Sequence, residues 1–456
     1  MKFFDREKEL KRLHRFLQTG GGGLAVVYGR RRCGKSTLLQ KAMGSQPVYV
    51  LADQRESPLQ IQSVAEALAP SFPALERARY SGWDDLFAAL YARAPTPLCL
   101  CLDEFPYLVQ SSPELPSILQ RYIDRKDGWV KWILCGSSQR MMQGLVLERT
   151  APLYGRAREL FKVTPLDAGW IAKALKLGPN EAVEAFSVWG GVPRYWELAA
   201  DYTSLREALM DLVWDAQGVL RDEPLRLLLD DMRSASQPYS LLSLVGAGCH
   251  RVSEMAARSQ KPMTSLMRPL NQLVELGYLR RDIPFGENPR NSKLSLYRLD
   301  DPFMRFFFRF VLPFQSALAQ GVMKGAEAAW NVGRVHHLAA CWEQLARLSV
   351  PRMTFAGQSW GTASAWWNRA GGDIEIDVLA LSVDGQEILA GECKWLERKQ
   401  SLDLSAIDRR LRDRVTAMPL ADGKSVVTAC WLGGEARTTG KIDAIFRPEQ
   451  VLDTLL

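Results

Sequence analysis

The stretch LAVVYGRRRCGKSTLLQ, residues 24–40, constrains the fold of this chain more than any other feature. An apolar run typical of a buried strand leads to Gly29 and Gly34, which have four residues between them, and then to Lys35 and Ser36. A loop that wraps around a phosphate needs backbone N–H groups that point inward, and glycine permits that curvature. The helix expected to begin near Lys35 adds the positive end of its dipole. The spacing G-x-x-x-x-G-K-S between a strand and a helix therefore predicts a phosphate-binding loop.

ATP and Mg²⁺ are the cofactors that such a loop predicts. We expect Lys35 to place its charge on the β- and γ-phosphates and Ser36 to bind Mg²⁺. The residues expected to surround the nucleotide phosphates are Gly29, Arg30, Arg31, Arg32, Cys33, Gly34, Lys35, Ser36 and Thr37. The three arginines leave alternatives open, because they can face the phosphates, a partner subunit or only water.

A second apolar run, LCLCLDE at residues 98–104, supplies the acids that a site of this kind needs. We expect Asp103 to bind Mg²⁺ through water and Glu104 to orient and deprotonate the attacking water. The alternative is an acidic turn at a strand end without a catalytic role. The nearby phosphate loop favours the catalytic interpretation.

Strands and helices alternate along residues 1–165, which predicts a parallel α/β sheet of the P-loop NTPase class. The runs expected to form strands covered on both faces are LAVVYG, PVYVLAD, LCLCLDE and WVKWILCGSS. The expected helices cover residues 5–18, 58–70, 83–93 and 114–125.

At 456 residues the chain exceeds one compact core, and four further segments follow from its pattern. Residues 166–230 contain only helical patterns and would form a helical lid. Residues 231–300 combine three short helices with a two-stranded hairpin, the order of a winged helix-turn-helix. Residues 301–335 are predicted as a helical linker, and residues 336–456 as a second α/β domain.

The predicted winged helix holds most of the net charge of the chain. Residues 249–310 contain eleven lysines and arginines against six acidic residues, and so account for +5 of the net charge of +7. The candidate contacts to DNA phosphates are Arg268, Arg280, Arg281, Arg290 and Lys293. DNA is thus a predicted partner through residues 249–310 and the C-terminal domain. The alternative is a winged helix that only packs against the first domain.

The stretch GGDIEIDVLALSVDGQEILAGECKW, residues 371–395, predicts two strands with acids on one face. Asp377 lies on the first strand, and Glu392 and Lys394 lie two apart on the second. This pattern is typical of the PD-(D/E)xK, restriction-endonuclease-like fold, in which the acids hold a divalent metal and the lysine polarises water. The usual proline is replaced by Ile376, and Glu343 on the preceding helix is a further candidate metal ligand. An exposed charged hairpin and a fold without cleavage activity remain the alternatives.

Over nearly its whole length the chain resembles the archaeal-type, AAA+-like ATPase family of archaea and bacteria. The segments that carry the resemblance are FFDREKEL, VVYGRRRCGKSTLL, LCLDEFPYL, ILCGSS, LYGRA and WGGVPRYWE. The resemblance implies ATP hydrolysis, a sensor at Ser137 or Ser138 near the γ-phosphate, and an arginine finger or sensor at Arg156. It also implies contacts of Arg6 near the adenine and of Pro193 in the lid. A surface ion pair for Arg156 is a structural alternative.

Composition and termini exclude several other classes of protein. The eight cysteines form no CxxC pair and the four histidines show no zinc-site spacing, which predicts a reducing compartment. The N-terminal run MKFFDREKEL lacks the apolar stretch of a signal peptide. The nearest candidate for a membrane span, FMRFFFRFVLPF, is broken by Arg305, Arg309 and Pro313. We therefore expect a cytoplasmic protein without membrane contact, and a homo-oligomer stays open.

Two functions of different classes fit these observations. In the first, Mg-ATP controls a DNA-binding winged helix and a nuclease-like domain. In the second, the protein is a nucleotide-gated signalling or scaffolding ATPase with a silent C-terminal domain and protein partners. Only the first predicts binding to DNA that weakens steeply with salt.

Overall fold

The computed structural model describes residues 3–44, 48–93, 98–125, 127–232, 234–288, 290, 292, 294–367 and 376–456. They form two compact units. The N-terminal unit comprises residues 4–165 and 229–233, and the second unit comprises mainly residues 166–228 and 234–456. Each unit builds a five-stranded sheet of its own.

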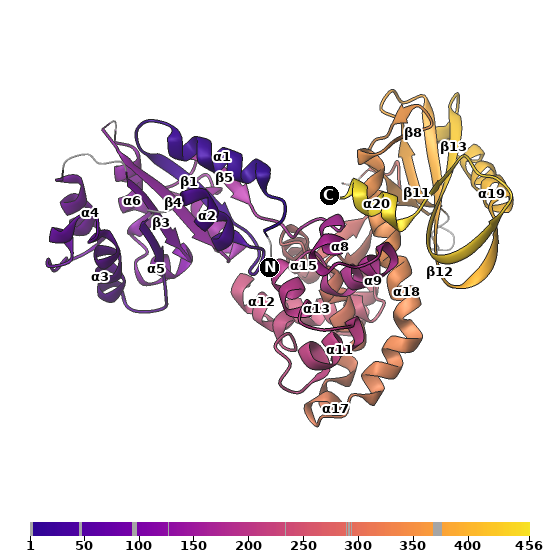
Figure 1. Cartoon of the computed structure of the whole chain (residues 1–456), viewed down its shortest axis with the longest axis horizontal. Coiled ribbons are helices and arrows are strands. Elements are labelled where there is room, and N and C mark those ends of the chain that lie inside the picture. The colour runs from indigo at the N-terminus through magenta and orange to yellow at the C-terminus, as the bar shows by residue number, and fades with distance from the viewer. Residues whose placement is uncertain are drawn as a thin grey trace. The chain divides into compact units, whose positions relative to one another are not determined.

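A parallel sheet forms the centre of the N-terminal unit (Figure 1). In spatial order its strands are β2 (Val48–Leu51), β3 (Leu98–Asp103), β4 (Val130–Gly136), β1 (Gly23–Tyr28) and β5 (Ala157–Lys162). β1 is buried along its whole length, as its apolar sequence predicts. The α/β class is therefore confirmed. The sequence patterns missed β5, because its residues ARELFK mix charged and apolar side chains at the edge of the sheet.

Seven α-helices flank this sheet among the described residues. They are α1 (Glu7–Gln18), α2 (Lys35–Met43), α3 (Ser57–Leu68), α4 (Trp83–Tyr91), α5 (Phe105–Ser111), α6 (Leu115–Ile123) and α7 (Gln139–Val146). α1 packs beside α2 and β5. Two ion pairs fix this position, because Arg12 and Arg15 both reach the buried Glu159 of β5, at 2.5 and 3.2 Å.

Helices alone make up the first part of the second unit. They are α8 (Gly169–Leu175), α9 (Pro179–Trp189), α10 (Pro193–Ala199), α11 (Leu205–Leu209) and the start of α12 (Glu223–Asp231), whose last residues belong to the N-terminal unit. Next come α13 (Ser236–Gly246), α14 (Val252–Ser259) and α15 (Met263–Glu275). The antiparallel strands β6 (Leu279–Asp282) and β7 (Leu296–Leu299) follow. Three helices and a two-stranded ribbon thus occur in the expected order, while the identification as a winged helix stays a prediction.

Residues 301–335 belong to a core and not to a linker, contrary to the sequence-based expectation. They contain α16 (Pro302–Phe310), α17 (Gln315–Ala319) and the start of α18 (Lys324–Ser349). The five phenylalanines of α16 are all buried, and Phe306 and Phe310 pack edge-on against Trp330. The boundary predicted at residue 336 falls inside α18, because that helix continues unbroken into the C-terminal region.

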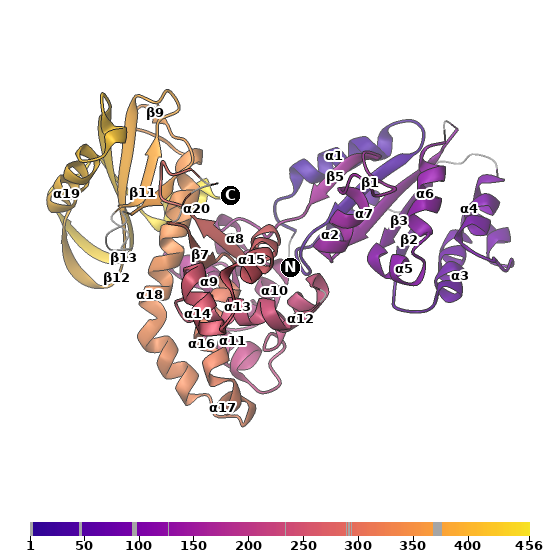
Figure 2. The ribbon, with the colours of Figure 1, turned by 180° about the vertical axis from the view of Figure 1, so that it is seen from behind.

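The C-terminal sheet contains the other predicted strands. Its order is β10 (Ser364–Trp366), β11 (Ile376–Leu381), β12 (Glu387–Asp403), β13 (Ser425–Thr439) and β14 (Ala444–Phe446). α18 and α19 (Leu404–Thr416) lie on opposite sides of this sheet (Figures 1 and 2). The last helix, α20 (Pro448–Thr454), returns to pack on α8 and α9. A short ribbon of β8 (Thr354–Phe355) and β9 (Gln358–Ser359) precedes the sheet.

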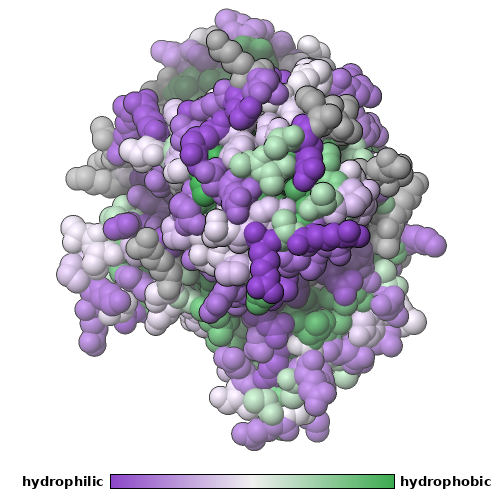
Figure 3. Space-filling view, turned by 90° about the vertical axis from the view of Figure 1, so that its left-hand side faces the viewer, coloured by the Kyte–Doolittle hydropathy of each residue, from purple (hydrophilic) through white to green (hydrophobic). Residues whose placement is uncertain are grey.

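In the part of the chain that the structure describes, no helix is long and apolar enough to span a membrane. The phenylalanine-rich α16 contributes to a protein core instead. On the face drawn in Figure 3, hydrophilic side chains lie among smaller hydrophobic patches.

Candidate functional site: a phosphate loop and a C-terminal carboxylate pair

The loop between β1 and α2 has a backbone that two glycines make possible. Gly29 has a φ of 146°, and a Cβ atom there would lie 2.2 Å from the carbonyl oxygen of Val163. Gly34 has a φ of 87° and directly precedes α2. A side chain at either position would strain the backbone. The predicted strand, tight loop and helix N-terminus are therefore present in this order.

The side chain of Lys35 reaches back across the loop that precedes this residue. Its ammonium group donates hydrogen bonds to the carbonyl oxygens of Gly29, at 2.9 Å, and Arg30, at 3.1 Å. The side chain is buried, which holds the positive charge next to the N-terminus of α2. Both features favour a phosphate group at this place.

Ser36 and Asp103 meet, although 67 positions separate them. Ser36 Oγ donates a 2.9 Å hydrogen bond to Asp103 Oδ2, and the hydroxyl of Tyr49 on β2 donates to the same oxygen. Burial and the hydrogen bond to Asp103 raise the pKa of Tyr49 far above its usual range, so the phenol remains a donor. A hydroxyl and a carboxylate this close are the oxygen ligands that Mg²⁺ prefers. The pair therefore fits the ion that the sequence predicts.

Glu104 is oriented by its backbone and by a serine that directly follows the neighbouring strand β4. Its φ of 52° is left-handed, a conformation that non-glycine residues adopt rarely and often at functional positions. Its carboxylate accepts hydrogen bonds from the amide of Ser137, at 3.1 Å, and from the hydroxyl of Ser137, at 2.7 Å. Ser138 instead caps α7, where its hydroxyl accepts a 3.4 Å hydrogen bond from the amide of Met141. Of the two candidate sensors, Ser137 is thus the one that contacts the acid.

The strand order explains why these groups converge. β4 lies between β1 and β3, so the carboxyl ends of all three parallel strands meet at one edge of the sheet. The phosphate loop, Asp103 and Ser137 follow these three ends. Ligand sites of open α/β sheets lie at this edge.

Arg6 lies near the carboxyl ends of the strands of this sheet, and Arg156 lies near their amino ends. The Arg6 guanidinium donates to the carbonyl oxygen of Thr164, which follows β5 at the edge that carries the phosphate loop. Arg156 precedes β5 and donates to both carboxylate oxygens of Asp124, each at 2.9 Å. Because β5 runs parallel to β1, Arg156 lies at the amino ends of the strands, away from the phosphate loop, and its role as a sensor stays a prediction. A finger that acts on another copy stays a prediction.

Two acids at the end of α12 also reach this site, and no sequence pattern singled them out. Asp230 lies 3.1 Å from the guanidinium of Arg31, and Asp231 accepts a 3.1 Å hydrogen bond from the amide of Gln139 at the start of α7. One of the three loop arginines therefore faces an acid of its own chain.

The other residues predicted to contact the nucleotide are described by their burial and backbone conformation. Arg30 and Cys33 are buried, Arg32 has a left-handed φ of 68°, and Thr37 is exposed. Pro193 opens α10 in the second unit, and its contact with a nucleotide stays a prediction.

The C-terminal acids share one side of the hairpin, as predicted. The antiparallel register pairs Val378 with Gly391, so Asp377 stands opposite Glu392. Asp377 accepts a 2.8 Å hydrogen bond from the amide of Cys393. Burial and, next, the carboxylate of Glu343 on α18 raise the pKa of Asp377 to about 6. The three acids are therefore close enough to interact electrostatically.

Both carboxylate oxygens of Glu392 form ion pairs with cations of the same chain. Lys394 lies 2.6 Å from one carboxylate oxygen, and Arg410 of α19 lies 2.5 Å from the other. Although burial opposes it, these two cations hold the pKa of Glu392 below its usual range. Sequence spacing predicted Lys394 but gave no signal for Arg410, which looks like any charged position of an amphipathic helix.

The ion pairs of Glu392 set a condition for metal binding at this second site. In the described ranges, no group of three or more His, Cys, Asp and Glu side chains is arranged to hold a metal ion. The predicted ligand roles of Glu343, Asp377 and Glu392, and the catalytic role of Lys394, stay predictions. Any metal here would first have to displace an ion-paired cation from Glu392.

The arginines of the predicted winged helix divide into exposed and inward-facing ones. Arg268 on α15 and Arg290 in the hairpin loop are exposed. Arg280 is instead half-buried and forms ion pairs with Asp282, at 2.9 Å, and Asp300, at 3.5 Å. Its prediction as a DNA phosphate contact is therefore wrong, because its charge is already used inside the unit. Lys293 lies outside the described residues, and Arg281 is half-buried.

Comparison with known proteins agrees with the phosphate-loop geometry. Residues 3–198 match the family described as an ATPase domain predominantly from Archaea, and residues 307–405 match a family of archaeal and bacterial proteins of unknown function. The chain is 28% identical over 431 residues to uncharacterized protein MJECL04 of Methanocaldococcus jannaschii, covering 92% of this chain and 93% of that protein.

The solved structures to which the chain is similar include two archaeal proteins. The Walker-type ATPase PABY2304 of Pyrococcus abyssi is 19% identical, with a TM-score of 0.49, over 67% of this chain and 96% of that one. The ORC2 protein of Aeropyrum pernix is 15% identical, with a TM-score of 0.47, over 72% of this chain and 95% of that one. The family match rests on the sequence, and it covers the phosphate loop, Asp103, Glu104 and Ser137. Residues 3–198 of this chain are therefore similar to ATPase domains found predominantly in Archaea, the family that its motifs resemble.

Proposed function

We propose that this protein hydrolyses Mg-ATP and that its nucleotide state controls DNA binding by residues 231–300. The observation that carries the proposal is a pair of contacts at one sheet edge. Ser36 meets Asp103 at 2.9 Å, and Ser137 meets Glu104 at 2.7 Å. The first contact suits a magnesium nucleotide, and the second orients an acid toward the same place.

Each residue has a defined task in this proposal. Lys35 offsets charge on the β- and γ-phosphates, and Ser36 and Asp103 hold Mg²⁺, which supplies further positive charge there when bound. Glu104 orients a water molecule and accepts its proton. Ser137 fixes the direction of the Glu104 carboxylate through two hydrogen bonds.

DNA is the proposed partner because exposed cations remain on the three-helix and hairpin segment. Arg268 lies on α15, the third helix, next to the exposed Met267, and Arg290 lies in the loop of the hairpin. In winged helices the third helix enters the major groove and the hairpin touches the backbone. Arginines at these two places would contact phosphates and bases of one duplex.

The C-terminal sheet favours a second candidate, the nucleotide-gated signalling or scaffolding ATPase. The observation behind it is that both oxygens of Glu392 are paired with Lys394 and Arg410. In this second candidate function the C-terminal domain has no catalytic activity. Metal-dependent DNA cleavage is the competing proposal, and it rests on Asp377 standing opposite Glu392 with Lys394 beside them.

The proposal is tested by measuring phosphate release and DNA affinity on the same preparations. We expect Lys35→Ala to lose ATP binding and turnover and to bind DNA equally with and without ATP, whereas the wild type responds to ATP. Lys41→Ala, an exposed lysine of the same helix, is the control. Arg268→Gln should reduce the slope of log affinity against log salt by about 1.

Two results would count against the proposal. ATP hydrolysis without any salt-dependent DNA binding would favour the signalling candidate. Wild-type turnover in folded Lys35→Ala protein would contradict the phosphate site itself.

A further inference from the structure

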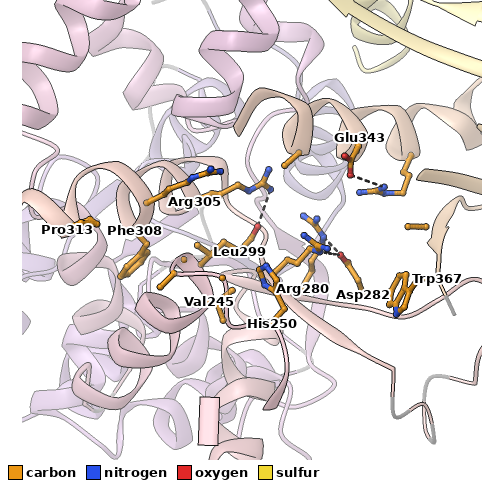
Figure 4. Close-up of a pocket in the computed structure, with 18 residues that line it drawn as sticks. Val245, His250, Arg280, Asp282, Leu299, Arg305, Phe308, Pro313, Glu343 and Trp367 are labelled. Carbon is orange, nitrogen blue, oxygen red and sulfur yellow. Dashed lines mark hydrogen bonds and ion pairs between the residues drawn. The ribbon is translucent and has the colours of Figure 1, made fainter. Parts of the chain in front are cut away.

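A cavity of about 520 Å³ in the second unit gathers five arginines (Figure 4). It lies between the turn after α13, the β6–β7 hairpin, α16, α18 and β10. The arginines that line it are Arg280, Arg298, Arg305, Arg309 and Arg347. Its size is that of a small-molecule site.

Carboxylates neutralise only part of this charge. Asp282 lies 2.9 Å from Arg280 and 3.2 Å from Arg298, and Asp300 lies 3.5 Å from Arg280. On the α18 side, Glu343 lies 3.8 Å from Arg347. Among the described residues these pairs place three carboxylates against five guanidinium groups.

The two remaining arginines have other surroundings. Arg305 donates to the carbonyl oxygen of Leu299, at 3.1 Å, and to the side-chain oxygen of Gln344, at 2.6 Å, both of which are uncharged. Arg309 lies over the ring of Phe310, and it has no hydrogen bond or ion pair in the part of the chain described. Figure 4 shows Arg305 and Arg280 reaching the same space from α16 and from the hairpin.

The charge is unfavourable to the unit that contains it. Burial and, next, repulsion from Arg280 lower the pKa of Arg305 to about 10. Burial also lowers the pKa of Arg298, although Asp282 opposes this. An excess of positive charge that includes buried arginines is stabilised by an anion, and arginine binds phosphate through two parallel hydrogen bonds.

The cavity continues toward the C-terminal sheet into a second hollow, which has a further hydrogen-bond donor in its lining. A second hollow of about 520 Å³ shares Arg280, Asp282, Arg347, Ala365 and Trp367 with the first. Trp367 is 2% exposed, and its indole N–H has no hydrogen-bond partner among the described residues. A ligand longer than a phosphate ion, with an acceptor atom and a flat apolar part, suits this combination.

We propose that this cavity binds a small phosphate ester of nucleotide size, separately from the phosphate loop. Its phosphate would contact Arg298, Arg305 and Arg309, and its remaining part would extend toward Trp367. Because α18 also carries Glu343, whose negative charge acts on Asp377, such a ligand would bind next to the C-terminal carboxylates.

The experiment uses the full chain with Lys35→Ala, so that the phosphate loop does not account for binding. Calorimetric titrations with pyrophosphate, AMP and ATP are compared with a 5′-phosphorylated oligonucleotide. We expect one small-ligand site per chain, and an increase in melting temperature on binding.

Two arginine variants and one control locate the site. Arg309→Gln and Arg298→Gln should each weaken binding about tenfold or more, because each removes a charge-assisted hydrogen bond. Arg258→Gln, an exposed arginine of α14 outside the cavity, should change the affinity less than about twofold. Since Arg309 is exposed, its substitution preserves the fold even if that of Arg298 does not.

The proposal is overturned if none of the three small probes binds to the Lys35→Ala protein. It is also overturned if binding is unchanged in Arg309→Gln and Arg298→Gln, or if only the oligonucleotide binds.

Discussion

The phosphate-loop site and the C-terminal carboxylate site both bring two acids and a lysine together, yet their acids have different partners. Asp103 accepts hydrogen bonds from Ser36 and Tyr49, which are neutral. Glu392 lies between Lys394 and Arg410, which are charged. A neutral donor permits a cation to approach the acid, whereas an ion pair must first be broken. We therefore propose that residue type and spacing alone do not make a metal site, and that the charge of the groups paired with the acids matters as well.

The largest effect that tests this comparison is expected from removing the proposed base, Glu104. We expect Glu104→Gln to bind ATP as the wild type does but to hydrolyse it about 10²- to 10⁴-fold more slowly, because an amide cannot accept the proton. Phosphate release at saturating ATP measures this loss. The matched change at the other site, Glu392→Gln, should leave ATP turnover unaltered, and a wild-type rate in Glu104→Gln would assign the base elsewhere.

The second prediction concerns Asp377, whose pKa is raised to about 6. The folded state binds this proton more tightly than the unfolded chain does, so the contribution of Asp377 to the free energy of unfolding should fall as the pH rises from about 4 to 6, by up to about 3 kcal/mol. Asp377→Asn should abolish this fall and be more stable than the wild type at pH 7. Denaturant titrations across this pH range measure it.

Asp384, whose pKa is shifted in the opposite direction, is the comparison residue for the experiment on Asp377. A hydrogen bond from Ser382 lowers the pKa of Asp384, so its contribution has the opposite sign and is lost as the pH falls. A wild-type pH profile in Asp377→Asn would show that its carboxylate is not the group that titrates.

The third prediction separates the two serines that follow β4. Ser137→Ala removes the 2.7 Å hydrogen bond to Glu104 and should lower kcat about tenfold with little change in KM. Ser138→Ala should affect mainly stability, by about 1 kcal/mol, because it removes the cap of α7. Equal kinetic effects of both changes would argue against a specific role for Ser137.

The smallest expected effect is that of Arg410→Gln. Arg410 is partly exposed, so losing its ion pair with Glu392 should cost less than about 1 kcal/mol of stability. Arg409→Gln, its exposed neighbour, should have no measurable effect on the melting temperature. A large destabilisation in Arg410→Gln would mean that Lys394 alone does not compensate the buried carboxylate of Glu392.

The parts of the fold and site that were predictable are those encoded by neighbouring residues. The phosphate loop and the strand ending in Asp103 and Glu104 are contiguous, so local patterns identify them. Tyr49, Asp231 and Arg410 enter the two sites from distant segments, and no local pattern reports such a contact. Arg280 shows the converse error, because counting charge does not reveal whether a side chain faces solvent or an acid of the same unit.

The most direct test of the comparison is to count bound Mn²⁺, used in place of Mg²⁺, by electron paramagnetic resonance with and without a non-hydrolysable ATP analogue. The account predicts one Mn²⁺ per chain, bound only with the analogue, lost in Asp103→Asn and kept in Asp377→Asn. Mn²⁺ that binds without nucleotide, survives Asp103→Asn and is lost in Asp377→Asn would contradict it.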